Sequence, residues 1–179
     1  MKKYIQTNIN DFLNENNKKL LAPNGNISNL NKQLYNYVRT QEFKNWFGDW
    51  ENDSQNSSKV LDINGEPLVC YHRSSKKFDP NNVPYMIGWL GTGFYFSDNK
   101  TSFKEYGKFI LQCFLNIRTP FIVNGNSPSD AYTEVKQKYN LENENITIPL
   151  KNNGYDGVFF NHWDKGYIIT CFNSSQIGL

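Results

Sequence analysis

A histidine, a serine and two tyrosines are the residues of this chain whose types and spacing could do chemistry. His72 closes a strand-like run and Ser74 follows two positions later, so an extended strand directs both side chains to one side. Tyr95 lies in a second strand-like run, between two phenylalanines, and faces away from both. Tyr106 follows a short helical segment. Such side chains can line a slot for a flat ring beside a ribose, because phenol rings stack and imidazole and hydroxyl groups hydrogen-bond to hydroxyls.

Glycines near the second run could bring the backbone close to a ligand. Gly91 and Gly93 flank Thr92 just before Tyr95. A glycine in a strand permits close approach of another backbone or a ligand, and it equally accommodates a bulge or a bend. We take Gly93 as a candidate ligand-contacting position, and the bulge stays open as the alternative.

The first third of the chain has helical spacing. Residues 1–58 contain a short helix expected at 9–13 and a stronger one from Ser28. An aromatic segment follows at 43–50, which we expect to close a helix and to pack on a sheet. We therefore expect residues 1–58 to form an N-terminal helical segment.

From residue 59 the apolar period changes to two. This pattern predicts a hairpin over 60–72 with a tight turn at Asn64 and Gly65. Further strands are expected at 91–96, 109–117, 120–123, 154–160 and 167–172, and helices at 101–106 and 127–139. We expect His162 and Trp163 to lie in an exposed loop. Together these elements indicate an α+β fold with residues 59–179 as the main domain, which we expect to form one compact unit with the helical segment.

Composition excludes several function classes. The chain has 179 residues and a formal net charge of +2, which is too small to indicate nucleic-acid binding by itself. Its three cysteines stand singly in apolar runs, so we expect small buried side chains and no metal site. The first residues lack an apolar targeting segment, so we expect a protein that is cytoplasmic where it is made and has no membrane partner.

The motifs resemble those of the ADP-ribosyltransferases of the diphtheria-toxin and poly(ADP-ribose) polymerase branch. The resemblance covers 59–179 and is closest to the transferase domains of phage polyvalent proteins and bacterial effectors. It rests on Tyr71-His72, the 91–99 strand Gly-Thr-Gly-Phe-Tyr-Phe-Ser-Asp-Asn, Gly-Tyr-Asp-Gly at 154–157 and the segment at 172–177, together with the aromatic segment at 43–50. It implies the ADP-ribosyltransferase fold, a split antiparallel β-sandwich, here with an N-terminal helical cap.

The resemblance also implies roles for the residues named above. His72 matches the histidine that binds the nicotinamide-side ribose of NAD, and Ser74 matches a hydroxyl residue at the same end. Tyr95 matches the second member of a His-Tyr-Glu triad, and Tyr106 a tyrosine that stacks on nicotinamide. Arg73 stands where the family usually has a glycine whose backbone grips the nicotinamide amide, so it is a candidate NAD contact as well.

The third triad position carries no acid. Counting back from Gln176 places it on Ile168, whereas counting from the 167–169 strand places it on Gly166. Polymerase-like relatives with Ile at this place resemble mono-ADP-ribosyltransferases whose acidic acceptor assists the reaction. Asp164 is an alternative, a displaced acid that could replace the missing Glu. Asp156 and Glu105 are weaker candidates, and we expect Asp156 to be a turn residue.

The sequence therefore predicts a glycosyltransferase-class enzyme that moves one ADP-ribose from NAD, used as substrate, to a macromolecule and releases nicotinamide. A protein acceptor is favoured over a nucleic acid, with acceptor specificity expected in loops at 76–87 and 140–153, and we expect a monomer that needs no metal. Two alternatives stay open: a degenerate relative that binds NAD or a partner without chemistry, and an NAD glycohydrolase. Delivery into a host or target cell as an effector also stays open.

Overall fold

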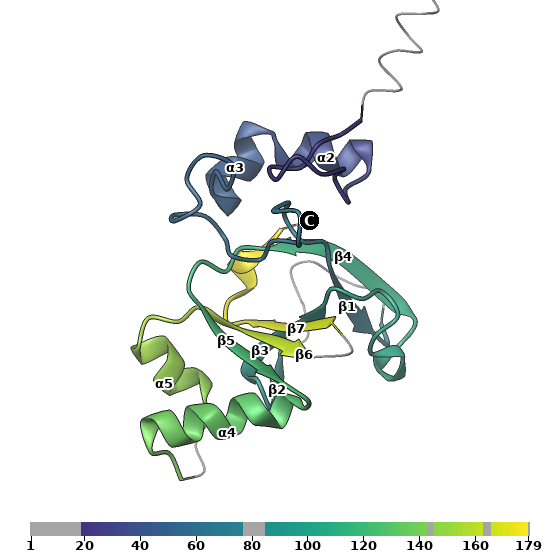
Figure 1. Cartoon of the computed structure of the whole chain (residues 1–179). Helices are drawn as coiled ribbons and strands as arrows, with labels where there is room; N and C mark the ends of the chain where they lie inside the picture. Colours follow the sequence, from purple (N-terminus) through teal and green to yellow (C-terminus); the bar gives the residue numbers. More distant parts are fainter. Residues whose placement is uncertain (1–18, 77–84, 143–144, 163–165, 179) are drawn as a thin grey trace, which may run out of the picture.

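The computed structural model describes residues 19–76, 85–142, 145–162 and 166–178 (Figure 1). The predicted helix at 9–13, Trp163 and Asp164 lie outside these residues. The described residues form four helices, α2 (Lys32–Val38), α3 (Gln41–Phe47), α4 (Pro128–Tyr139) and α5 (Thr147–Asn152). They also form two 3₁₀ turns, η1 (Lys104–Tyr106) and η2 (Ser174–Gln176). The strands are β1 (Cys70–Ser74), β2 (Met86–Gly88), β3 (Gly91–Ser97), β4 (Phe109–Leu115), β5 (Pro120–Gly125), β6 (Gly157–His162), β7 (Gly166–Cys171) and β8 (Ile177–Gly178).

The strands pair into one eight-stranded sheet of order β5-β6-β7-β3-β1-β4-β8, with β2 paired to β3. All pairs are antiparallel except β5 with β6. A single register pair, Tyr71 with Ser97, joins β1 to β3. This arrangement is a mixed α+β fold, consistent with an ADP-ribosyltransferase. The split sandwich and the division into 1–58 and 59–179 stay predictions.

Helices α2 and α3 lie over β4 on one side of the molecule, and α4 and α5 lie on the opposite side (Figure 1). The side chains of Asn31 and Thr40 cap α2 and α3 by accepting hydrogen bonds from backbone N–H groups. Phe43 and Phe47 are buried in one cluster with Phe114 of β4, and the ring of Phe43 meets that of Phe114 edge to face. The expected packing of the 43–50 segment on a sheet is confirmed, and a cap spanning all of 1–58 stays a prediction.

Strand alternation sends neighbouring residues of β3 into different hydrophobic clusters. Phe94 and Phe96 join a cluster with the three buried cysteines. Tyr95 packs on the other side, against the cluster beneath α4 and α5. The predictions that Tyr95 faces away from both phenylalanines and that the cysteines are buried are confirmed.

One local prediction holds only in part and two were wrong. The tight turn of the hairpin predicted over 60–72 is present, since the Gly65 N–H donates to the Asp62 carbonyl oxygen and Leu61 pairs with Pro67, but the pairing is one bridge long and β1 begins only at Cys70. The helix expected at 101–106 is the short turn η1, because Phe103 adopts a left-handed conformation (φ 59°) that an α-helix cannot continue through. His162 does not lie in an exposed loop: it is the last residue of β6, paired with β5 and β7, and is 8% exposed.

Candidate active site

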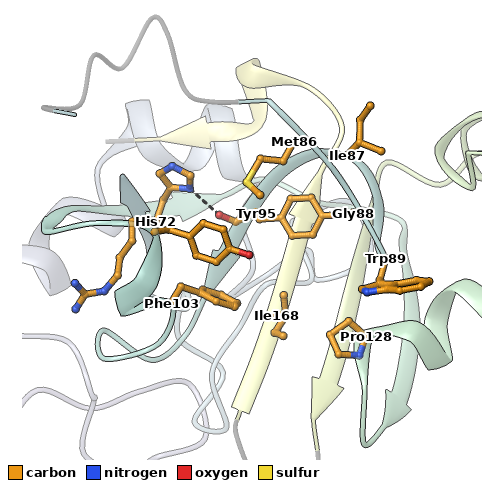
Figure 2. A pocket seen from close by; sticks show the side chains of 11 residues that line it. His72, Met86, Ile87, Gly88, Trp89, Tyr95, Phe103, Pro128 and Ile168 are labelled. Atoms are coloured by element: carbon orange, nitrogen blue, oxygen red, sulfur yellow. Dashed lines mark hydrogen bonds between the residues drawn. The ribbon is translucent and has the colours of Figure 1, made fainter. Parts of the chain in front are cut away.

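A pocket of about 320 Å³ opens where β1, β3 and β7 meet, a volume at the low end of small-molecule sites. Its walls come from β1, the 86–89 hairpin, Tyr95 of β3, the turn that carries Phe103 and Tyr106, Ile168 of β7, and the first residue of α4. Figure 2 shows His72 at one end and Trp89 with Pro128 at the other. The pocket thus brings together five of the predicted site residues: His72, Arg73, Tyr95, Tyr106 and Ile168.

His72 is held in one tautomer by the backbone of β3. Its Nδ1 lies 2.8 Å from the carbonyl oxygen of Tyr95 (Figure 2), and a carbonyl only accepts, so Nδ1 carries the proton. Burial lowers the pKa of His72, and the hydrogen bond to Tyr95 offsets this effect only in part. The ring is therefore neutral at pH 7, and its Nε2 has the chemistry of an acceptor.

Tyr95 presents its ring to the pocket and uses its hydroxyl to hold the hairpin above it. The hydroxyl donates to the carbonyl oxygen of Gly91 at 2.5 Å. A Cβ atom on Gly88 would come within 2.7 Å of the same hydroxyl, so glycine lets the hairpin lie against the phenol. Burial raises the pKa of Tyr95 to about 12. The phenol thus stays protonated at neutral pH and is suited to stacking and hydrogen bonding rather than to acting as a base.

Arg73 fastens the turn that carries two of the pocket's aromatic rings. Its guanidinium donates to the carbonyl oxygens of Lys100, at 2.8 Å, and Gly107, at 3.2 Å. Between these anchors lie Phe103 and Tyr106, whose rings meet edge to face with centroids 5.8 Å apart. The long side chain of Arg73 therefore lies along this turn, held by its two hydrogen bonds. Tyr106 lies at the edge of the pocket and is 49% exposed.

Of the two positions predicted for the third triad member, Ile168 lines the pocket and Gly166 does not. Ile168 packs on the same side of the sheet as Tyr95. Gly166 lies directly against Asp98: a Cβ atom at position 166 would come within 2.5 Å of the Asp98 carboxylate. Asp98 accepts a hydrogen bond from the Tyr167 N–H at 2.9 Å, and burial raises its pKa.

No acidic residue lines the pocket within the part of the chain that the structure describes. Asp156 accepts hydrogen bonds from the N–H groups of Arg118 and Thr119, so its carboxylate joins two distant segments; it lies between the turn at 153–154 and β6 and not in the turn predicted for it. Glu105 is exposed beside Tyr106 and does not line the pocket. The role of Asp164, outside the described residues, stays a prediction.

Two predicted ligand contacts lie outside the pocket. Ser74 is at the end of β1, where its hydroxyl accepts a hydrogen bond from the Lys76 N–H at 3.2 Å. Gly93 is buried, and a Cβ atom there would come within 2.4 Å of the Cys171 carbonyl oxygen, so this glycine permits the close pairing of β3 with β7. Roles of Ser74 and Gly93 toward a ligand stay predictions.

Sequence reasoning missed the hairpin that covers the pocket. Gly88 pairs with Gly91 across a two-residue loop of Trp89 and Leu90, and Met86, Gly88 and Trp89 all line the pocket. In the sequence, two glycines three positions apart, Gly88 and Gly91, indicate such a tight hairpin. Phe103 and Pro128 were also missed, because nothing in their local sequence indicates that a turn and a helix start meet at this pocket.

Among the described residues, no group of three or more His, Cys, Asp or Glu side chains is placed to hold a metal ion. None of the described helices combines the length and the apolar character needed to cross a membrane.

A family model described as "ADP-Ribosyltransferase in polyvalent proteins" matches residues 62–178. The match covers about two thirds of the 179 residues and every residue that lines the pocket. No curated protein matches the chain.

Proposed function

The chain belongs to the ADP-ribosyltransferases of polyvalent proteins, and from this premise we propose that it transfers a single ADP-ribose from NAD to a macromolecular acceptor. The observation that carries the proposal is the convergence of His72, Tyr95, Tyr106 and Ile168 on one pocket. These residues come from separate elements, and their meeting supports a common ligand.

The chemistry asks little of an acid catalyst. The nicotinamide ring of NAD is a cationic pyridinium, so it leaves as a neutral molecule when the bond to ribose breaks, and the ribose becomes oxocarbenium-like, as in glycoside cleavage. The protein must hold the ring and the ribose in place, stabilise the developing cation and admit an acceptor.

The pocket residues suit these tasks. The rings of Tyr95 and Tyr106 would hold the nicotinamide by stacking, a contact worth about 0.5–1.5 kcal/mol per aromatic pair. The neutral imidazole of His72 would accept a hydrogen bond from a ribose hydroxyl through Nε2, since Nδ1 donates to Tyr95. Arg73 would keep Tyr106 in place through its two bonds to the turn.

The Ile at position 168 supports transfer of one ADP-ribose unit. Elongation of a chain requires activation of a ribose hydroxyl, and no carboxylate lines the pocket among the described residues to do this. Removal of one charge-stabilising group typically costs on the order of 10²–10³ in rate. An acceptor that brings its own negative charge would compensate for it, and Asp164 as a displaced acid is the other route.

The lack of a carboxylate in the pocket lining, among the described residues, also supports a second candidate function. A pocket without a carboxylate would also suit a relative that binds NAD without cleaving it. Calorimetric titration with NAD, followed by an assay for released nicotinamide, separates the two: binding without release in the presence of a host lysate favours the second candidate. Release without any acceptor would instead indicate a glycohydrolase.

The direct test is mass spectrometry of a host lysate incubated with the protein and NAD. We expect acceptors heavier by one ADP-ribose, and loss of this adduct in His72→Ala and Tyr95→Ala. His162→Ala is the matched control, because His162 is the other histidine of the chain and is also buried, outside the pocket. Adducts retained in both pocket variants would overturn the assignment of the site.

A further inference from the structure

The backbone of Thr92 lies just past the point where β3 and β7 stop pairing. In the register of these two strands, Phe94 lies opposite Cys171, which is the last residue of β7. Thr92, two residues earlier in β3, lies beyond this end, where the chain turns away at Asn173 into η2. Since Thr92 is buried, its N–H and C=O groups need partners from another element.

The hydroxyl of Thr147, the first residue of α5, takes the place of the missing strand. It accepts a hydrogen bond from the Thr92 N–H at 2.7 Å and donates to the Thr92 carbonyl oxygen at 3.1 Å. A hydroxyl can satisfy both groups because it is a donor and an acceptor at once. Asn145 completes the arrangement: its side chain donates to the Thr92 hydroxyl and accepts from the Thr147 N–H at 3.0 Å.

The contact of α5 with β3 extends to Gly91, the neighbour of Thr92. Gly91 has a φ of 88°, and a Cβ atom there would overlap the Thr147 hydroxyl, so the start of α5 lies directly against this backbone. The carbonyl oxygen of Gly91 accepts the hydrogen bond from the Tyr95 hydroxyl. The segment of Gly91 and Thr92 is therefore bonded both to Thr147 and to Tyr95.

Thr147 is buried and does not line the pocket, whereas Tyr95 does. Any effect of the Thr147 hydroxyl on a ligand therefore has to pass through the backbone of Gly91 and Thr92. A shift of this backbone would move the acceptor of the Tyr95 phenol, and misplacement of a positioning group by about 1 Å is enough to weaken its action on a ligand.

We propose that Thr147 is a positioning residue for NAD: its hydroxyl fixes Gly91 and Thr92, and the Gly91 carbonyl in turn fixes the phenol of Tyr95. The inference rests on the proposed function and extends it to a residue of α5 outside the pocket. It gives α5, which contributes no residue to the pocket lining, a defined part in holding the ligand.

The test compares replacements of Thr147 by calorimetric titration of the full chain with NAD. Thr147→Val keeps the branched shape but leaves the N–H and C=O of Thr92 without partners, so it should raise the dissociation constant for NAD about ten-fold. Thr147→Ser keeps the hydroxyl and should stay within about two-fold of the wild type. Asn145→Ala removes only the outer bonds and should raise the constant about three-fold.

Ser58→Ala is the matched control for loss of a buried hydroxyl that bonds to backbone groups. The Ser58 hydroxyl donates to the carbonyl oxygen of Leu115 at 2.8 Å and accepts from the N–H of Ile117 at 3.1 Å, outside the pocket. This variant should lower the melting temperature about as much as Thr147→Val but keep the wild-type affinity for NAD. Equal losses of affinity in the two variants, or no rescue by Thr147→Ser, would overturn the proposal.

A double-mutant cycle with Tyr95→Phe tests the route of the effect. Tyr95→Phe keeps the ring but removes the hydrogen bond to Gly91. In this background Thr147→Val should change the dissociation constant by less than about two-fold, because the phenol no longer depends on the Gly91 carbonyl. The same ten-fold change in both backgrounds would show that Thr147 does not act through Tyr95.

NMR of the protein without NAD gives a readout that is independent of the proposed function. With isotope-labelled tyrosine, the signal of the Tyr95 phenol is identified by its absence in Tyr95→Phe. It should shift in Thr147→Val and stay unchanged in Thr147→Ser and Ser58→Ala. An unchanged signal in Thr147→Val would overturn the inference even if NAD binds. A shifted signal in a protein that neither binds nor cleaves NAD would uphold the link from Thr147 to Tyr95, and the proposed function would fail instead.

Discussion

Two aromatic groups of this chain serve opposite purposes. Around α3 and β4, Phe43, Phe47, Trp50 and Phe114 are each less than 5% exposed and pack ring against ring. Around the pocket, Trp89 and Tyr106 remain about half exposed, although each meets another ring on one side. The rings of the first group cover one another, whereas each ring of the second group keeps one side exposed to solvent.

The difference shows where the chain gains stability and where it keeps binding surface. Aromatic residues make up 16% of the sequence, and their number alone does not separate the two uses. Exposed rings beside a pocket are maintained at a cost in hydrophobic burial, and binding of a planar ligand recovers that burial. The buried group should therefore govern unfolding, and the exposed group should govern affinity.

The largest effect is expected in the buried group. Phe47→Ala should lower the free energy of unfolding by about 3–5 kcal/mol, because it opens a cavity among packed rings. Urea unfolding measures this loss. NAD affinity per folded molecule should stay at the wild-type value, and a parallel loss of affinity would break the distinction between the two groups.

In the exposed group, Tyr106→Ala should weaken NAD binding about ten-fold, or about 1.4 kcal/mol, through loss of one stacked ring. Its effect on unfolding should stay within about 0.5 kcal/mol, as for other exposed positions. Calorimetric titration with NAD measures the affinity, and Tyr106→Phe, which keeps the ring, serves as the control. Equal losses in Tyr106→Ala and Tyr106→Phe would exclude stacking as the cause.

A smaller effect is expected from Arg73→Gly, which restores the residue usual in the resembling family. Loss of two hydrogen bonds to the turn should raise the KM for NAD about five-fold by loosening Tyr106, with little change in kcat. Arg118→Gly is the control, because its side chain bonds to Trp46 and Asn116, outside the pocket. A fall in kcat with KM unchanged would show that Arg73 acts on the reaction step instead.

The smallest effect is a pH dependence. Burial holds the pKa of His72 below its ordinary value of 6.5, so the unfolded chain binds more protons than the folded one between the two pKa values. The stability that His72 contributes is complete above pH 6.5 and falls as the pH drops below it. NAD affinity should weaken a few-fold at still lower pH, where the imidazole of the folded protein gains its proton at its lowered pKa. In His72→Gln, thermal unfolding and NAD titration followed by calorimetry should show neither the stability nor the affinity changing with pH in this way. A pH dependence that persists in this variant belongs to another group.

Local patterns predicted most of the strands and the facing of Tyr95, because alternation and turn residues act over a few positions. The hairpin predicted at 60–72 forms its turn, but it is shorter than predicted because β1 pairs with β4, a partner distant in sequence, and one bridge closes the turn. The choice between Ile168 and Gly166 required the register of β7 against β3, in which Asp98 occupies the space beside Gly166. The bonds of Arg73 to residues 27 and 34 positions away had no signal in the sequence at all.

The central claim is that one nicotinamide ring is held among His72, Tyr95 and Tyr106. A crystal structure of the full chain with a non-hydrolysable NAD analogue tests it most directly. We predict density for the nicotinamide stacked on Tyr95 and Tyr106, with a ribose hydroxyl at Nε2 of His72. Density for the ring elsewhere, for instance in the groove between Arg118 and Gln176, would contradict the claim.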